Sequence, residues 1–316
     1  MASQLSFKLT HRAPKKPIKR LPVTLELSSE ATVEEAKREI ARLTGIRDFN
    51  RVGLFDPTTK KTLKDRKALV AEHDGVMKTG EIQVKDLGPQ LAWRTVYIAE
   101  YFGPILFHAL VPLLRPYLYL VAPFQYKNET ETPLSQVQWL LLALIQIHFL
   151  KRELETIFLH RFSANTMPAW FIVRNSFFYW AVAGLAGAFE IYAPHGLAAR
   201  NQLGLVDYVS IALFVYGEVC NFIVHSHLAS LRKPGGTEKG IPNCIGSSMV
   251  TCPNYMFEFI AWAGIILMSR SMAMVVFIAI GTYYMKIWSV GKEKTLRQVF
   301  GDRYKKKRYG VLPGIL

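Results

Sequence analysis

Polar and ionisable side chains stand inside apolar sequence in the C-terminal half of the chain. Asn221 and His225 lie in one apolar run, and Asn254, Tyr255 and Glu258 open another, directly after a proline. Such groups are costly in a lipid bilayer, so several in one region usually line a ligand or catalytic cavity. A carboxylate and an asparagine together can pair with the donors and the acceptor of a carboxamide. The second group therefore suits an amide-bearing ligand.

The first of these runs predicts a polar helix face. Glu218, Asn221 and His225 recur at i, i+3 and i+7, and Arg232 stands seven residues further on. If the helix continues that far, one stripe about four turns long leads from the bilayer to its surface. We interpret the whole set as a ligand site, whereas hydrogen bonding between helices is the better explanation of Glu218 alone.

Three more charged residues are candidates for the functional site because of their positions in the chain. Arg152 and Arg161 follow the end of an apolar run. At such a place arginine either reaches the membrane surface along its apolar stem or clamps a phosphate group. Glu100 lies roughly two turns inside another apolar run, where a carboxylate needs a partner or a function.

Several other chemistries lack support in the sequence. The chain contains no GxGxxG, GxxxxGK[ST], HExxH or GxSxG motif, so Rossmann, P-loop, zinc-protease and serine-hydrolase mechanisms have no signature. The three cysteines, Cys220, Cys244 and Cys252, include no CxxC pair, and we expect neither a disulfide framework nor a metal site. A nucleotide would therefore need a pocket formed by the membrane helices themselves.

Composition changes along the 316 residues and predicts three parts. The chain is 50% hydrophobic and 20% charged, and the two kinds of residue are separated. We expect a cytosolic domain at 1–87, a transmembrane domain at 88–290 and a basic cytosolic tail at 291–316. The net charge of +15 fits the cytoplasmic segments of a membrane protein. Because no nucleic-acid motif accompanies this charge, we expect no nucleic-acid binding.

The first part predicts a small α/β fold. Thr32 and Glu35 form a capping box ahead of a helix at Val33–Leu43, which Gly45 ends. Strands are expected in four alternating or short apolar runs: Leu5–Thr10, Leu21–Leu27, Arg51–Phe55 and Gly80–Val84. This order of elements suggests a ubiquitin-like β-grasp. It would be either a docking surface or a folded cap without a partner, and both interpretations stay open.

The second part predicts a mainly α-helical bundle of six transmembrane helices. The candidate spans are Leu91–Val121, Leu134–Leu150, Asn175–Tyr192, Leu205–Val224, Asn254–Ser269 and Met272–Val290. An even number of spans puts both termini on one side of the membrane. Lysine and arginine gather after the second, fourth and sixth spans, so the positive-inside rule places both termini in the cytosol.

Together these segments resemble the steroid 5-alpha-reductase family and, within it, the enoyl-CoA reductase branch. The resemblance covers nearly the full length. It rests on these motifs: Trp93–Pro104 (WRTVYIAEYFGP), Lys151–Thr156 (KRELET), His160–Ser163 (HRFS), Leu231–Gly235 (LRKPG) and Cys252–Glu258 (CPNYMFE). KRELET and HRFS are specific to the enoyl-CoA reductase branch, whereas the NYxxE element is shared across the wider family.

The resemblance implies a reaction and a setting. The chain would use NADPH to reduce the trans-2,3 double bond of a very-long-chain enoyl-CoA. This is the last step of the microsomal fatty-acid elongation cycle, which feeds sphingolipid synthesis. The protein would then lie among the lipids of the endoplasmic reticulum membrane. Its partners would be the other elongation enzymes: elongase, ketoacyl reductase and dehydratase.

The resemblance also assigns residues by their places in the motifs. Asn254 and Glu258 would hold the nicotinamide carboxamide, and Tyr255 and Glu100 would act in catalysis. The ribose and phosphate parts of the cofactor would be held by the remaining candidates: Arg152, Arg161, Asn221, His225 and Arg232. The basic tail would complete this cofactor site.

The chain departs from the family pattern at three points. One is the tail, where Tyr304-Lys305 stands in place of the usual TyrPro pair. After the last span, Gly291–Leu296 lacks the histidine and the tyrosine that the family often has. Phe149 stands where steroid reductases carry a tyrosine, which counts against a steroid 3-ketone as substrate. The alternatives are a sterol or polyprenol enone reductase of the same family, a non-enzymatic scaffold that recruits partners through its N-terminal domain, and a membrane methyltransferase.

Overall fold

The computed structural model describes all residues except 1–2, 120–132, 163–165, 234–235, 237–238 and 316. The protein is mainly helical, as predicted. It divides into two compact units, each with its own hydrophobic core. The first consists of Met1–Trp93 and Phe162–Phe171, and the second of Arg94–Arg161 and Ile172–Leu316.

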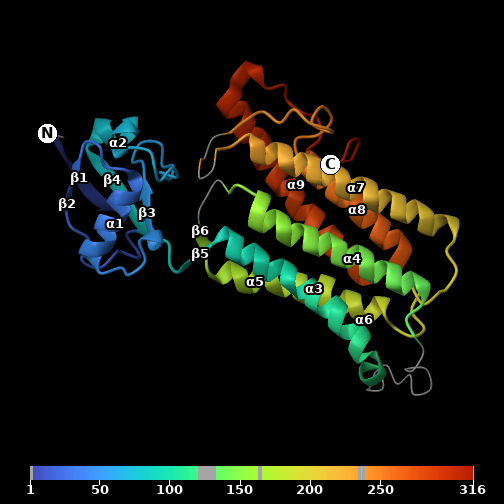
Figure 1. Ribbon diagram of the computed structural model, residues 1–316. Coiled ribbons are helices and arrows are strands. Elements are labelled where there is room, and N and C mark those ends of the chain that lie inside the picture. Colours follow the sequence, from blue (N-terminus) through green and yellow to red (C-terminus); the bar gives the residue numbers. More distant parts are fainter. Residues whose placement is uncertain (1–2, 120–132, 163–165, 234–235, 237–238, 316) are drawn as a thin grey trace. The chain divides into compact units, whose positions relative to one another are not determined.

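The first unit is built on a four-stranded sheet in the order β2-β1-β4-β3 (Figure 1). Its strands are β1 Gln4–His11, β2 Thr24–Ser28, β3 Val52–Phe55 and β4 Glu81–Asp86. β1 runs parallel to β4, and the other neighbouring pairs are antiparallel. Strands are therefore present in all four predicted runs. The second begins at Thr24, later than expected, and Val23, which its alternation placed in the core, is 73% exposed.

The helix of this unit, α1 Val33–Thr44, begins and ends as its sequence predicts. Thr32 N donates to Glu35 Oε2 at 2.7 Å and Glu35 N donates to Thr32 Oγ1 at 3.2 Å, which completes the capping box. Gly45 ends the helix at φ 75°, a left-handed conformation that glycine adopts without strain. Three short elements were not predicted: α2 Asp74–Thr79 and the paired strands β5 Gln90–Ala92 and β6 Thr166–Pro168.

In the second unit, helices occupy all six ranges in which spans were predicted. They are α3 Trp93–Leu118, α4 Gln136–Leu154, α5 Trp170–Phe178 with α6 Gly187–Ile191, α7 Leu205–Ser230, α8 Pro253–Ser269 and α9 Met272–Phe300 (Figure 1). Within the described residues, three helices are long and apolar enough to cross a membrane: α3, α7 and the stretch Met272–Arg303. The number of six spans stays a prediction.

Two stretches of this unit wind as π-helices. Glu155–Leu159 (η3) continues α4, and Tyr179–Ala186 (η4) joins α5 to α6. π-turns in helices often mark functional sites. Here Glu155 begins the first stretch and Tyr179 the second, and both side chains face residues of the candidate site. The Tyr179 ring, for example, contacts the Tyr101 ring edge-on at 5.5 Å.

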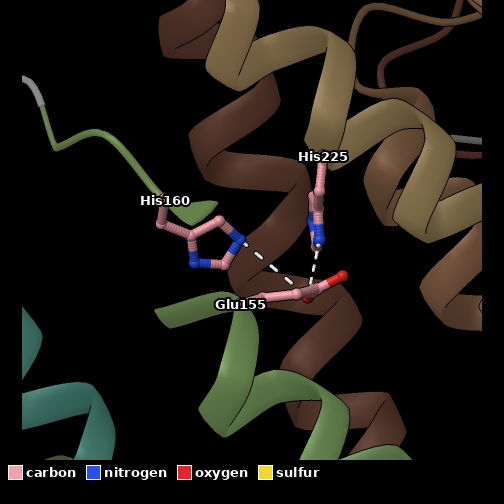
Figure 2. Close-up of side chains that lie close together, drawn as sticks. All are labelled: Glu155, His160 and His225. Atoms are coloured by element: carbon pink, nitrogen blue, oxygen red, sulfur yellow. Dashed lines mark hydrogen bonds and ion pairs between the residues drawn. The ribbon is translucent and has the colours of Figure 1, made fainter. Parts of the chain in front are cut away.

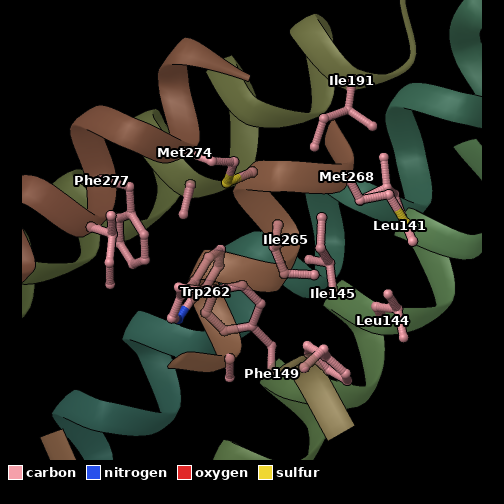
Figure 3. Close-up of a cluster of buried hydrophobic side chains, with 14 of the residues drawn as sticks. Leu141, Leu144, Ile145, Phe149, Ile191, Trp262, Ile265, Met268, Met274 and Phe277 are labelled. Atoms are coloured by element: carbon pink, nitrogen blue, oxygen red, sulfur yellow. The ribbon is translucent and has the colours of Figure 1, made fainter. Parts of the chain in front are cut away.

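The core of the second unit surrounds α8, which contacts α4, α7 and α9. Figure 3 shows Trp262 and Ile265 of α8 beside Ile145 and Phe149 of α4. The two helices α7 and α8 approach closely at Gly264, where a Cβ atom would lie 2.4 Å from the backbone oxygen of Ser210. Small residues permit such contact in apolar surroundings, and the contact brings polar side chains of α7 and α8 within hydrogen-bond reach.

The predicted polar stripe on α7 is too long. Glu218, Asn221 and His225 share the buried face of this helix, but the helix ends at Ser230. Arg232 therefore lies beyond it and off the stripe. The physical reason stands in the sequence, since Pro234 follows and a proline disfavours helical backbone in the residue before it. Helix α9, in contrast, runs past residue 290, at which the predicted membrane domain ends.

Candidate functional site

Asn221 of α7 joins two residues of α8 that the sequence also singled out. Its Nδ2 donates to the backbone oxygen of Asn254 at 2.9 Å and to Glu258 Oε2 at 3.3 Å. The side chain of Asn221 is buried, and these two contacts use both of its N–H donors. Asn221 therefore holds the start of α8 and the Glu258 carboxylate relative to α7.

Glu258 lies in a network of charged and polar groups in the interior of the unit. It contacts His148 Nε2 at 3.4 Å and accepts from Trp262 Nε1 at 3.3 Å. His148 Nδ1 is 2.6 Å from one oxygen of Glu218, whose other oxygen is 2.8 Å from Lys151 Nζ. The contacts of Glu258 are longer than the usual N–H···O separation of about 2.9 Å. Its carboxylate can therefore still accept a stronger donor.

A second cluster surrounds Glu155 at the start of the π-helix η3. Glu155 Oε2 is 2.9 Å from both Arg152 NH1 and His225 Nδ1, and 3.9 Å from His160 Nε2; Figure 2 shows the two histidines beside the carboxylate. Arg152 also donates to the Tyr101 hydroxyl at 2.9 Å. Two residues predicted to bind the cofactor, Arg152 and His225, are thus brought together by Glu155.

Glu155, His160 and His225 are also the residue types of a metal site, and their ligand atoms lie within 4.8 Å of one another. Imidazole and carboxylate ligands suit zinc or iron. Here, however, Arg152 NH1 is in contact with both Glu155 Oε2 and His225 Nδ1. Its positive charge opposes a second cation at the same place. We therefore describe the cluster as an ion-pair network, and the expectation that no metal is used stays a prediction.

The two expected catalytic residues lie on different helices. Glu100 of α3 is buried, and Asn175 Nδ2 donates to its Oε1 at 2.7 Å. Tyr255 lies on α8, where Lys292 Nζ is 4.9 Å from the centre of its ring. Among the described residues no hydrogen bond joins Glu100 to Tyr255.

Arg161 and Arg232 lie together at the end of α7. Arg232 NH1 donates to the backbone oxygen of Arg161 at 2.6 Å, and Arg161 NH1 donates to that of Arg232. A guanidinium group carries five N–H donors, so Arg161 keeps donors beyond this contact. The two arginines are therefore neighbours, and guanidinium groups gathered in one place suit phosphate.

Several residues of these networks were not assigned a role from the sequence, among them Lys151, Glu155 and Lys292. Lys151 and Glu155 had a detectable signal, because opposite charges at i, i+4 lie on one helix face next to Arg152. Lys292 had none, since it stands in a basic stretch where lysines are usually solvated.

The α8 residues fit the nicotinamide end of a dinucleotide cofactor. Asn254 Oδ1 is buried and has no hydrogen-bond partner among the described residues. A buried acceptor without a partner costs about 1–3 kcal/mol, so a ligand donor at this point would be favourable. Glu258 lies one turn further along the same helix face. Two acceptors placed in this way match the two N–H donors of a carboxamide.

Comparison with known proteins agrees with the resemblance seen in the motifs. The sequence pattern of the family described as 3-oxo-5-alpha-steroid 4-dehydrogenase matches residues 165–316. This stretch includes α5 to α9 and the tail, and so it contains Asn221, Asn254 and Glu258. The helices that carry the amide and carboxylate groups are therefore those of a steroid-dehydrogenase-type membrane domain.

Relatives that match over nearly the full length indicate the branch of the family. The very-long-chain enoyl-CoA reductase of Dictyostelium discoideum is 34% identical over 296 residues, which cover 92% of this chain and 93% of that protein. The "Probable very-long-chain enoyl-CoA reductase art-1" of Caenorhabditis elegans is 33% identical over 308 residues, which cover 94% and 95%. The chain therefore belongs to the steroid 5-alpha-reductase family, in the branch of the very-long-chain enoyl-CoA reductases.

Proposed function

We propose that the protein uses NADPH to reduce the trans-2,3 double bond of a very-long-chain enoyl-CoA. The observation that carries this proposal is the pair of acceptors on α8, Asn254 Oδ1 and Glu258, which Asn221 holds in place. They would accept the two N–H groups of the nicotinamide carboxamide. The relatives suggest the substrate, since both are called very-long-chain enoyl-CoA reductases.

The other cofactor candidates divide into binding and positioning groups. Arg152, Arg161 and Arg232 would bind the phosphate and ribose parts through guanidinium donors. His225 positions Arg152, because both contact the same oxygen of Glu155. Asn221 acts in the same indirect way, through Glu258.

The reaction needs an acid and a positive charge near the thioester. Bound NADPH would supply a hydride to the β-carbon of the substrate. Negative charge then builds on the thioester oxygen, and a proton must reach the α-carbon. The Tyr255 hydroxyl can donate to that oxygen or deliver the proton, and Lys292 beside its ring stabilises the developing negative charge. Lys292 belongs to the stretch in which the family's histidine and tyrosine are missing.

Glu100 would serve as the orienting or proton-relay group of Tyr255. A buried carboxylate is costly, and the hydrogen bond from Asn175 compensates for only part of that cost. A buried carboxylate inside apolar sequence is a functional candidate, and a place in a proton relay is one such function.

We also propose the setting that the resemblance implies. The protein would cross the endoplasmic reticulum membrane six times with both termini cytosolic, and it would complete fatty-acid elongation for sphingolipid synthesis beside elongase, ketoacyl reductase and dehydratase. Helices in all six predicted ranges support the six spans. The sheet order of the first unit, with β1 parallel to β4, supports a ubiquitin-like domain, because a β-grasp has parallel central strands.

Two variants test the roles of α8 in purified protein in lipid nanodiscs. Tyr255→Phe should lower turnover of a very-long-chain trans-2-enoyl-CoA by about 10²–10⁴-fold and leave NADPH affinity within about twofold. Glu258→Gln should weaken NADPH binding by about tenfold or more. Asp302→Asn removes an exposed carboxylate and serves as the control. A wild-type protein that does not oxidise NADPH with this substrate would contradict the proposal.

Reduction of a steroid or sterol enone is the second candidate, because the matching family is described as a 3-oxo-steroid dehydrogenase. Phe149 opposes it. Its buried ring packs against Tyr101, Tyr179 and Trp262, so this position offers no hydroxyl to a ketone. Parallel assays of NADPH oxidation with an enoyl-CoA and with a steroid enone separate the two, and faster turnover of the enone would favour the second candidate.

A further inference from the structure

A cavity of about 390 Å³ lies against the C-terminal tail and is lined by consecutive basic residues. They are Lys305, Lys306, Lys307 and Arg308, and Tyr309 and Met249 also contribute to the lining. Within the described part of the chain, none of the four basic side chains forms an ion pair with a carboxylate. Their positive charge is therefore available to a ligand in this cavity.

The tail that carries these charges is held in place by one carboxylate of α9. Glu293 accepts from the Tyr304 hydroxyl at 2.6 Å, from Lys307 N at 3.2 Å and from Thr251 Oγ1 at 2.8 Å. Burial raises the pKa of Tyr304 above its usual range, so its hydroxyl remains a donor. A run of like charges in a solvated segment repels itself and extends. Here the backbone instead fixes the charges beside one cavity.

The cavity is tied to the candidate site through the start of α8. Thr251 N donates to Tyr309 O and Cys252 N donates to Gly310 O, both at 3.0 Å. Cys252 lies two residues before Asn254. On the other side, Glu293 follows Lys292, which contacts the Tyr255 ring. The basic cavity therefore adjoins the end of the site at which Tyr255 lies.

We propose that this cavity binds the phosphate groups of the CoA part of the substrate, namely its 3′-phosphate and its diphosphate. This inference rests on the proposed function. Several closely spaced anionic groups match consecutive lysine and arginine side chains, which bind phosphate readily. The ring of Tyr309, which contributes to the lining, offers a stacking surface for adenine. The long flexible arm of CoA would then lead from the cavity to a thioester beside Tyr255.

Equilibrium binding to the full chain in phosphatidylcholine nanodiscs tests this inference. The triple variant Lys305→Gln, Lys306→Gln and Arg308→Gln should bind CoA about tenfold or more weakly and lose less affinity for 3′-dephospho-CoA. Its affinity for NADPH should stay within about twofold. The control triple variant removes the same charge from exposed positions outside the cavity: Lys294→Gln, Arg297→Gln and Arg303→Gln. It should bind CoA as the wild type does, and both variants should unfold at the wild-type temperature.

If the cavity binds the phosphate groups of the cofactor or of lipids instead, the same measurements give different results. Weaker binding of NADPH with unchanged binding of CoA would overturn the inference and assign the cavity to the cofactor. Unchanged CoA binding would overturn it as well, and reduced activation by phosphatidylserine in the same variant would then assign the cavity to lipid headgroups. Because CoA binding is measured without turnover, a chain that binds CoA through these residues but reduces nothing would support the cavity and contradict the proposed function. An active triple variant with an unchanged KM for enoyl-CoA would contradict the assignment of the cavity and support the proposed function.

Discussion

The two units of the protein distribute apolar and charged side chains in opposite ways. In the first unit the core is apolar, as Ile40 and Leu54 illustrate, and most charges lie on its surface. In the second, large apolar side chains face outward, with Leu113 73% and Leu205 80% exposed, while charged groups such as Glu155 are buried. The first unit is thus built for water, and the second for an apolar surrounding with a polar interior.

This contrast extends to the way in which each unit accommodates a buried charge. Lys37 of the first unit is only 7% exposed, and its burial lowers its pKa to about 8, so the ammonium group is easily neutralised. Arg152 of the second unit remains a cation and is compensated by Glu155, with His225 beside both. Buried charge is therefore incidental in the first unit and part of a network in the second.

The largest effect is expected from removing the cation of that network. Arg152→Met leaves Glu155 buried without its main partner, which should destabilise the helical unit by about 3–5 kcal/mol. Thermal unfolding in detergent, followed by tryptophan fluorescence, measures this loss. Lys37→Met is the matched variant in the first unit and should change stability by less than about 1 kcal/mol. Equal losses in the two variants would remove the contrast between the units.

A smaller effect is expected where α7 and α8 approach each other. Gly264→Ala places a Cβ atom against the backbone of Ser210, so the helices must separate, at a cost of about 1–3 kcal/mol. Gly281→Ala is the control, because a Cβ there has nothing within 4 Å and alanine favours helix. Denaturation in detergent should rank Gly264→Ala below the wild type and Gly281→Ala at or above it. The opposite ranking would show that close packing of α7 on α8 does not stabilise the site.

The smallest effect is expected from a surface ion pair of the first unit. Arg51 NH2 lies 2.6 Å from Asp86 Oδ2, and this hydrogen bond lowers the pKa of Asp86. Because the folded pKa is depressed below an unfolded value of about 3.9, the stabilisation is present above that value and is lost as pH falls through the folded pKa. Both side chains are about a third exposed, so the contribution is at most about 1 kcal/mol.

Hydrogen exchange of the β3 and β4 amides in the full chain, corrected for intrinsic rates, measures this contribution between about pH 5 and pH 3. As the pH decreases, protection from exchange should fall in the wild type and fall less in Arg51→Met. Arg42→Met breaks the more exposed pair with Glu39 and serves as the control. A fall of the same size in Arg51→Met and the wild type would mean that Asp86 does not carry the pH dependence.

Much of this architecture follows from short-range patterns. The capping box at Thr32 and the helix end at Gly45 were predictable because each depends on residues within four positions. The helices of the second unit were predictable because long apolar runs are local features. Asn254 and Glu258 share one helix face for the same reason, since an i, i+4 spacing on a helix needs no tertiary information.

Only the tertiary structure decided which groups meet. His148 pairs with Glu218 across 70 residues of chain, and Lys292 meets Tyr255 although its basic stretch gave no sign of a partner. Arg232 shows the limit of periodicity, because the helix that was to carry it ends at Ser230. A repeating pattern indicates which face of a helix is polar. The partner of that face depends on how closely and at which residues two helices pack, and here that is set by contacts such as the one at Gly264.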